Sequence, residues 1–106
     1  MKTLVIMEHD GIALRPSSGA AVGFAREVNE DITALVLGEN LASMTTETAK
    51  LAPVLAADHS ALSAPVADRL AHVIVEVARA QNIELIVATA TTWAKAVVGR
   101  TAGVLG

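Results

Sequence analysis

The sequence of 106 residues contains no cysteine and no tyrosine, and only one phenylalanine and one tryptophan. Without cysteine, disulfides, thiolate catalysis and cysteine-based metal sites are excluded. Lysine and arginine total 8 against 11 acidic residues, with no basic cluster. This balance argues against a surface for nucleic acid or for anionic membranes, since both need concentrated positive charge.

Long apolar runs and glycine-rich phosphate loops are also missing. The N-terminal apolar run is too short for a signal peptide or a membrane span, so we expect a cytoplasmic protein, or a mitochondrial-matrix protein in a eukaryote. Neither G-x-G-x-x-G nor G-x-x-x-x-G-K-S/T occurs, and the loop after the first predicted strand contains only Gly11. Dinucleotide binding of the common type is therefore disfavoured, and a P-loop is excluded.

Short apolar runs do occur, and they alternate with helical patterns. Hydrophobic residues make up 53% of the chain, which is long enough for one domain, residues 1–106, with a core of alanine, valine, leucine and isoleucine. The predicted strands are 3–7, 32–37, 53–57 and 84–88, and the helices between and after them start near Pro16, Leu41, Ser63 and Trp93. Pro53 at the start of the third strand indicates an edge position.

This alternation of strands and helices predicts an α/β fold. Strands joined by helical crossovers indicate a Rossmann-like, doubly wound parallel sheet between two helical layers, in the strand order 3-2-1-4. In the first helix, Ala21, Phe24, Ala25 and Val28 share a predicted apolar face. The last strand, if no further strand follows it, would be a bare apolar edge that favours self-association.

The order 3-2-1-4 makes the first and fourth strands neighbours at the topological switch point, where such sheets bind ligands. Thr89, Thr91, Thr92 and Lys95 could hold a phosphate there through hydroxyls, helix N–H groups and an ammonium, or could simply cap and solvate the last helix. Glu8, His9 and Asp10 follow the first strand. They could be acid–base groups or a polar loop that contacts a neighbouring chain, and no nucleophile is clearly paired with them.

A candidate metal site on the third helix is weaker. Asp68, His72 and Glu76 are spaced four residues apart, which could place carboxylates and an imidazole on one face. Charged pairs at this spacing are common on solvated helix faces, and we interpret these three residues in that way. No metal site is therefore expected.

Several segments resemble electron transfer flavoprotein α subunits, and their order and spacing carry the likeness more than any single motif does. The resemblance covers essentially the whole chain. The segments are residues 1–10 (MKTLVIMEHD), 14–16 (LRP), 36–40 (VLGEN), 57–62 (ADHSAL), 88–95 (ATATTWAK) and 99–103 (GRTAG).

The resemblance implies a role in electron transport. The α subunit of this family pairs with a β subunit, and the heterodimer carries electrons on FAD from dehydrogenases, such as those that oxidise acyl-CoA, to a membrane quinone reductase. The present sequence matches only the family's N-terminal Rossmann-like domain, an interaction scaffold without catalysis of its own. The C-terminal domain, which supplies most of the FAD site, has no counterpart among these residues, so we expect this chain alone to bind no cofactor.

The resemblance also suggests which residues meet the partner. Glu8, His9, Asp10, Trp93 and Arg100 are the candidates for contacts with the β subunit. The chain is then either a fragment of a longer α subunit or a stand-alone relative. The alternative hypothesis is a small protein similar to the universal stress proteins, with an adenine nucleotide at the same switch point.

Overall fold

The computed structural model describes residues 2–28, 31–62 and 67–89, and these form an alternating series of strands and helices. A short 3₁₀ turn, η1, follows the third strand. The elements are β1 (Thr3–Ile6), α1 (Pro16–Val28), β2 (Ile32–Gly38), α2 (Ala42–Ala49), β3 (Val54–Asp58), η1 (Ser60–Leu62), α3 (Ala67–Ala80) and β4 (Leu85–Val87).

The four strands form one parallel sheet in the order β3-β2-β1-β4, as predicted. Thr3 of β1 lies beside Ile32 of β2 and beside Leu85 of β4. β3 is an edge strand, as Pro53 indicated. The ends of β1 and β4 are therefore neighbours, which is the condition for a site at the switch point.

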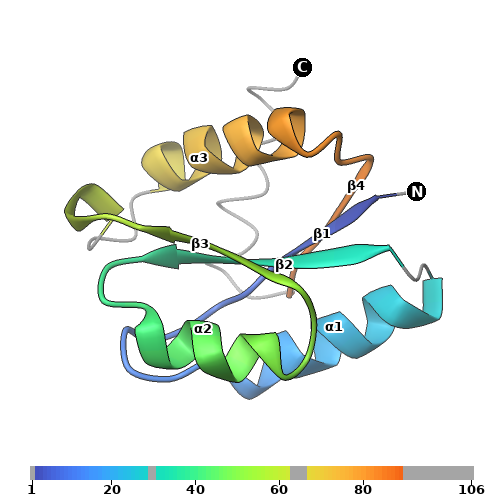
Figure 1. Ribbon diagram of the computed structural model, residues 1–106, viewed down its shortest axis with the longest axis horizontal. Coiled ribbons are helices and arrows are strands. Elements are labelled where there is room, and N and C mark those ends of the chain that lie inside the picture. Colours follow the sequence, from blue (N-terminus) through green and yellow to red (C-terminus); the bar gives the residue numbers. More distant parts are fainter. Residues whose placement is uncertain (1, 29–30, 63–66, 90–106) are drawn as a thin grey trace.

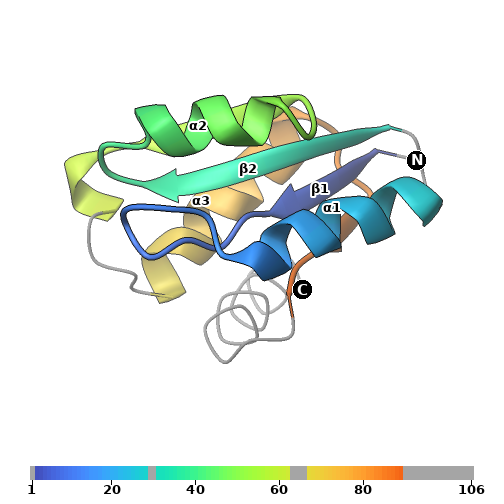
Figure 2. The ribbon, with the colours of Figure 1, turned by 90° about the horizontal axis from the view of Figure 1, so that it is seen from below.

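The helices lie on both faces of the sheet (Figures 1 and 2). α1 and α2 cover one face, over a core that includes Val5 and Val36, and α3 covers the other, over a core that includes Leu4 and Leu35. Successive residues of a strand point to opposite faces, so strands buried on both faces carry continuous apolar runs. The three-layer architecture predicted from the sequence is thus confirmed.

The predicted apolar face of α1 is wrong in part. Ala21 and Ala25 are buried, but Phe24 is 59% exposed and Val28 is 58% exposed. The buried stripe is instead completed by Ser18 and Val22. The hydroxyl of Ser18 accepts a hydrogen bond from the Glu8 N–H (2.7 Å) and donates one to the Glu8 carbonyl oxygen (3.0 Å), which sets the rotation of the helix and turns Phe24 outward.

The threonine-rich segment after β2 is helical in spite of its low propensity. Thr46 and Thr48 donate their hydroxyl protons to the carbonyl oxygens four residues earlier, and Thr48 and Met44 are buried. Tertiary packing therefore outweighs propensity here. The predicted last helix and the predicted cap at Ser63 lie outside the described residues, and no helix among those described is long and apolar enough to cross a membrane.

Candidate functional site

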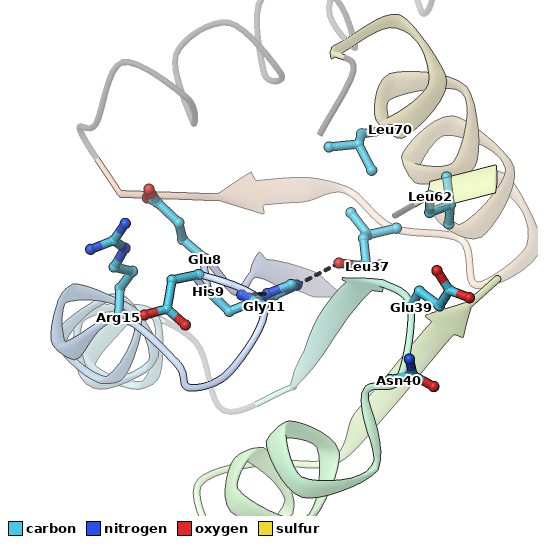
Figure 3. Close-up of a pocket in the computed structure, with 11 residues that line it drawn as sticks. Glu8, His9, Gly11, Arg15, Leu37, Glu39, Asn40, Leu62 and Leu70 are labelled. Carbon is cyan, nitrogen blue, oxygen red and sulfur yellow. Dashed lines mark hydrogen bonds between the residues drawn. The ribbon is translucent and has the colours of Figure 1, made fainter. Parts of the chain in front are cut away.

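A cavity of about 470 Å³ opens at the carboxyl ends of β1 and β2. Glu8, His9, Asp10 and Gly11 line it from the loop after β1, and Arg15 lines it from the residue before α1. Leu37 to Asn40 line it from the end of β2, and Leu62 and Leu70 close its apolar side (Figure 3). The cavity lies at the carboxyl edge of the sheet, on the β2 side of β1, whereas the switch point is on the β4 side of β1.

Glu8 joins the two strand ends that the sequence predicted to meet. It is only 8% exposed, and its Oε2 accepts a hydrogen bond from the Thr89 hydroxyl at 3.2 Å. Its backbone carbonyl accepts from the Arg15 N–H (2.8 Å), in addition to the contacts with Ser18. The carboxylate is thus held inside the domain by the chain's own groups.

His9 is held by hydrogen bonds on both ring nitrogens. The Gly11 N–H donates to Nδ1 at 3.0 Å, so Nδ1 carries no proton, and the proton on Nε2 is donated to the Leu37 carbonyl oxygen at 2.6 Å (dashed in Figure 3). This network assigns the neutral Nε2–H tautomer. With both nitrogens engaged, the ring links the loop after β1 to the end of β2.

Gly38 is required by the position of the imidazole. Its φ is +150°, and a Cβ built on it would lie 3.2 Å from Cε1 and Nε2 of His9 and from a methyl group of Leu41. A side chain at this position would therefore meet both a strained backbone and the ring.

Asp10 shapes the tip of the same loop. Its Oδ1 accepts hydrogen bonds from the Ile12 and Ala13 N–H groups, both at 2.9 Å. The hydrogen bonds from Ala13 and Ile12, with a smaller contribution from the Arg15 charge, lower the pKa of the Asp10 carboxyl below its usual value. The loop so formed presents Ile12, which is 83% exposed.

Asp58, at the end of β3, occupies the N-terminus of α2. Its two carboxylate oxygens accept from the Asn40 N–H (2.9 Å) and the Leu41 N–H (3.0 Å). Asn40 has a φ of 58°, which an asparagine tolerates better than most residues. Asp58 thus ties the segment just before α2 to the end of β3, and the N-cap residue of α2, Leu41, has no side-chain cap of its own.

The charges that line the cavity are mostly negative. Glu8, Asp10 and Glu39 contribute carboxylates, and Arg15 contributes a guanidinium. The lining that the structure describes contains no serine, cysteine or lysine that could act as a nucleophile. The Thr89 hydroxyl, one of the predicted phosphate ligands, donates to Glu8 instead. The other three predicted phosphate ligands, Thr91, Thr92 and Lys95, lie outside the described residues, so the structure describes that predicted site only at Thr89.

The structure brings together some of the predicted site residues and leaves others undescribed. Glu8 and Thr89 meet at the switch point, whereas His9 contacts the end of β2 and Asp10 bonds within the loop after β1. Among the described residues no group of three potential ligands could hold a metal, and His72 and Glu76 are exposed on α3. The predicted candidates outside the described residues are Thr91, Thr92, Trp93, Lys95 and Arg100.

Sequence reasoning did not include Arg15, Glu39 and Asn40 in the site. All three line the cavity, from the residue before α1 and from the end of β2. The signal that could have found Glu39 and Asn40 is their position directly after a buried strand that neighbours β1, since the carboxyl ends of parallel strands meet at one edge of the sheet.

Comparison with known proteins agrees with this architecture. The family profile described as "Electron transfer flavoprotein domain" matches residues 3–106. The chain is also 33% identical, over 108 aligned positions, to a protein named "Electron transfer flavoprotein subunit alpha" from Pseudomonas aeruginosa. The alignment covers 99% of this chain and 34% of that relative, so the chain spans about a third of the relative's length. The chain therefore belongs to the electron transfer flavoprotein domain family.

Proposed function

We propose that residues 1–106 are a single, N-terminal domain of an electron transfer flavoprotein α subunit, and that this domain is a docking scaffold for the β subunit. In the complete assembly FAD would carry electrons from dehydrogenases, such as those that oxidise acyl-CoA, to a quinone reductase. The chain itself would perform no catalysis. The observation that carries the proposal is the match of residues 3–106 to the family, together with the alignment of nearly the whole chain to a third of an α subunit.

The described cavity does not fit the pyrophosphate of FAD. Among the residues that the structure describes, three carboxylates and one guanidinium line it, and these charges repel a diphosphate more than they attract it. The carboxylate of Asp58 lies just before α2, where it accepts from the Asn40 and Leu41 N–H groups, and the Thr89 hydroxyl donates to Glu8. These contacts support a division of labour in which flavin binding belongs to other parts of the assembly.

The same contacts support docking by the outer surface of the loop after β1. The polar side chains of Glu8, His9 and Asp10 form hydrogen bonds within the domain that hold the loop in shape, and Asp10 is also exposed at the surface. The loop, held by the Asp10 hydrogen bonds to the Ile12 and Ala13 N–H groups, presents Ile12 at the surface. An exposed apolar side chain on a loop whose backbone is already held requires less ordering on binding, which suits an anchor in an interface.

Titration calorimetry of this chain with the electron transfer flavoprotein β subunit of the same organism tests the proposal. We expect saturable one-to-one binding that Ile12→Asp weakens at least about tenfold, which corresponds to about 1.4 kcal/mol. Ala20→Asp, at an exposed position of α1, adds the same charge and is the matched control, with no expected effect. Trp93→Ala and Arg100→Ala test the two remaining interface candidates. Absence of binding by the unmodified chain would overturn the proposal.

Parallel titrations with FAD, AMP and ATP examine the alternative, an adenine-nucleotide protein similar to the universal stress proteins. The acidic lining of the cavity and the engaged Thr89 hydroxyl speak against that alternative. We expect no binding of any of the three. Micromolar binding of AMP or ATP that Lys95→Ala removes would establish the alternative, and tight binding of FAD alone would refute the division of labour.

A further inference from the structure

The outer edge of β3 has an unusual pattern of backbone groups. The Ala34 N–H donates to the Pro53 carbonyl oxygen (2.8 Å), and the His59 N–H donates to the Gly38 carbonyl oxygen (2.8 Å). In a parallel ladder, every second residue of a strand directs both its N–H and its C=O group to the same neighbouring strand. These contacts therefore direct the backbone groups of Leu55 and Ala57 toward β2. The N–H and C=O groups of Val54, Ala56 and Asp58 therefore point away from the sheet, where no described backbone group pairs with them.

The usual protection of an edge strand is weak here. Native proteins blunt such edges with charges, prolines or bulges. Asp58 is the charged residue of β3, but its carboxylate is drawn back to the Asn40 and Leu41 N–H groups at the start of α2. Pro53 precedes the strand, and its carbonyl is directed to β2. Between them, the exposed side of the strand carries the small, uncharged side chain of Ala56.

An apolar hollow of about 340 Å³ adjoins this edge on the α3 face of the sheet. Leu55 and Ala57 line it together with Leu35 of β2, and Val77 and Ala80 line it from α3. Two polar residues, Glu76 and Gln81, complete its rim, so the lining is apolar in the main but not throughout. Both Leu55 and Val77 are only partly buried. A strand added beside β3 would thus gain main-chain hydrogen bonds and would also cover apolar surface.

We propose that this edge is a self-association surface, on which β3 of a second copy of the chain pairs antiparallel with β3. A two-fold axis at Ala56 and perpendicular to the sheet would place Ala56 opposite Ala56, and Val54 opposite Asp58. Each of these pairs can exchange two main-chain hydrogen bonds, because both backbone groups of each residue point outward. The result is one continuous sheet through both copies, closed by symmetry.

A second copy fits this edge for three reasons. Its β3 has the same length and the same spacing of outward groups, so the pairing is self-complementary. The small Ala56 side chains allow the two strands to approach closely at the axis. Each Asp58 carboxylate is held by the Asn40 and Leu41 N–H groups of its own chain, and the register places it opposite Val54 and not opposite the other Asp58. The axis also keeps both hollows on the same face of the sheet, side by side. This surface lies apart from the proposed β-subunit contact at Ile12.

Sedimentation velocity of the 106-residue chain between about 1 and 500 µM tests the proposal. We expect a reversible monomer–dimer equilibrium. Ala56→Lys places like charges opposite each other at the axis and should raise the dissociation constant at least about tenfold. Ala20→Lys, the same change at an exposed position of α1, is the matched control and should leave it unchanged.

Two further variants keep the test decisive if Ala56→Lys folds poorly by circular dichroism. Ala56→Pro removes an outward N–H that does not bond to β2, a substitution that edge strands tolerate, and should also yield monomers. Ala56→Ser keeps the edge intact and should keep the dimer. Amide exchange at Val54 and Ala56 should slow as the chain concentration rises. A wild-type monomer at all concentrations, larger assemblies, or a dimer that survives both Ala56→Lys and Ala56→Pro would overturn the proposal, whatever the result with the β subunit.

Discussion

The carboxyl end of the sheet and the outer edge of β3 differ in how their polar groups are paired. At the carboxyl end, the side chains of His9, Asp10 and Asp58 bind backbone groups of neighbouring loops. At the edge, the backbone groups of Val54 and Ala56 meet no described backbone partner. The sequence of the first region is rich in charged and polar residues that suggest a functional site, whereas the sequence of β3 is mostly apolar and suggests none.

This difference shows that a polar segment is not in itself a binding surface. The charges after β1 and β3 form hydrogen bonds that shape their loops, and Ile12 is exposed at the tip of the first loop. The alanine-rich β3 offers unpaired hydrogen-bonding groups, which have a strong tendency to find partners. The availability of a group for binding depends on its contacts, and these are visible only in the fold.

The largest expected effect at the carboxyl end is that of Gly38→Ala. The new Cβ would lie 3.2 Å from the His9 ring, at a φ of +150°, so we expect a loss of about 1–3 kcal/mol in the free energy of unfolding. Gly23→Ala is the control, because a Cβ there meets nothing within 4 Å and should stabilise α1 by about 0.5–1 kcal/mol. Urea denaturation measures both. Equal effects would mean that His9 does not pack on Gly38.

Asp58→Ala tests the residue that connects the two regions. The change leaves the Asn40 and Leu41 N–H groups without their carboxylate, and we expect a loss of about 1–2 kcal/mol. Glu39→Ala, at an exposed neighbouring position, should change the free energy of unfolding by less than about 0.5 kcal/mol. If the two variants behaved alike in thermal denaturation, the carboxylate of Asp58 would be free to protect the edge.

Thr3→Val tests a side-chain polar group that, unlike those at the carboxyl end of the sheet, is buried without a described hydrogen-bond partner. The Thr3 hydroxyl is buried and has no hydrogen-bond partner among the described residues. Replacing it by a methyl group of similar size should stabilise the chain by up to about 1 kcal/mol. Thr48→Val is the control, since the Thr48 hydroxyl already donates to the Met44 carbonyl oxygen at 2.8 Å. A destabilised Thr3→Val variant would reveal a partner for the hydroxyl.

The smallest effect concerns the pH dependence of the loop tip. The lowered pKa of Asp10 means that its ionised form contributes stability above the ordinary aspartate pKa, and that this contribution is lost as the pH falls through the lowered value. Between about pH 5 and pH 2, the amide resonances of Ile12 and Ala13 should shift together, with a midpoint below about 3.9. Asp10→Asn should abolish this titration. A midpoint at or above that value would show that the two hydrogen bonds do not form.

Much of the fold could be predicted, but the rotation of α1 could not. The alternation of strands and helices predicted the parallel sheet and the meeting of Glu8 with Thr89. Periodicity alone placed Phe24 inside, because it cannot register that the Ser18 hydroxyl binds the Glu8 backbone. The buried Ser18, held by two hydrogen bonds, sets which face of α1 packs on the sheet, and this face differs from the one that hydrophobicity alone predicts.

The sequence by itself determined the strand order and the position of the switch point, because these follow from the alternation of strands and helices along the chain, and it indicated the family through the order and spacing of the segments that resemble it. Only the tertiary structure decided which tautomer His9 adopts, why Gly38 has no side chain, and where the Asp58 carboxylate is directed. It also decided which backbone groups of β3 remain open. The physical reason is that hydrogen-bond pairing joins residues far apart in the chain, and their partners are set by strand register and loop geometry, which local patterns do not specify.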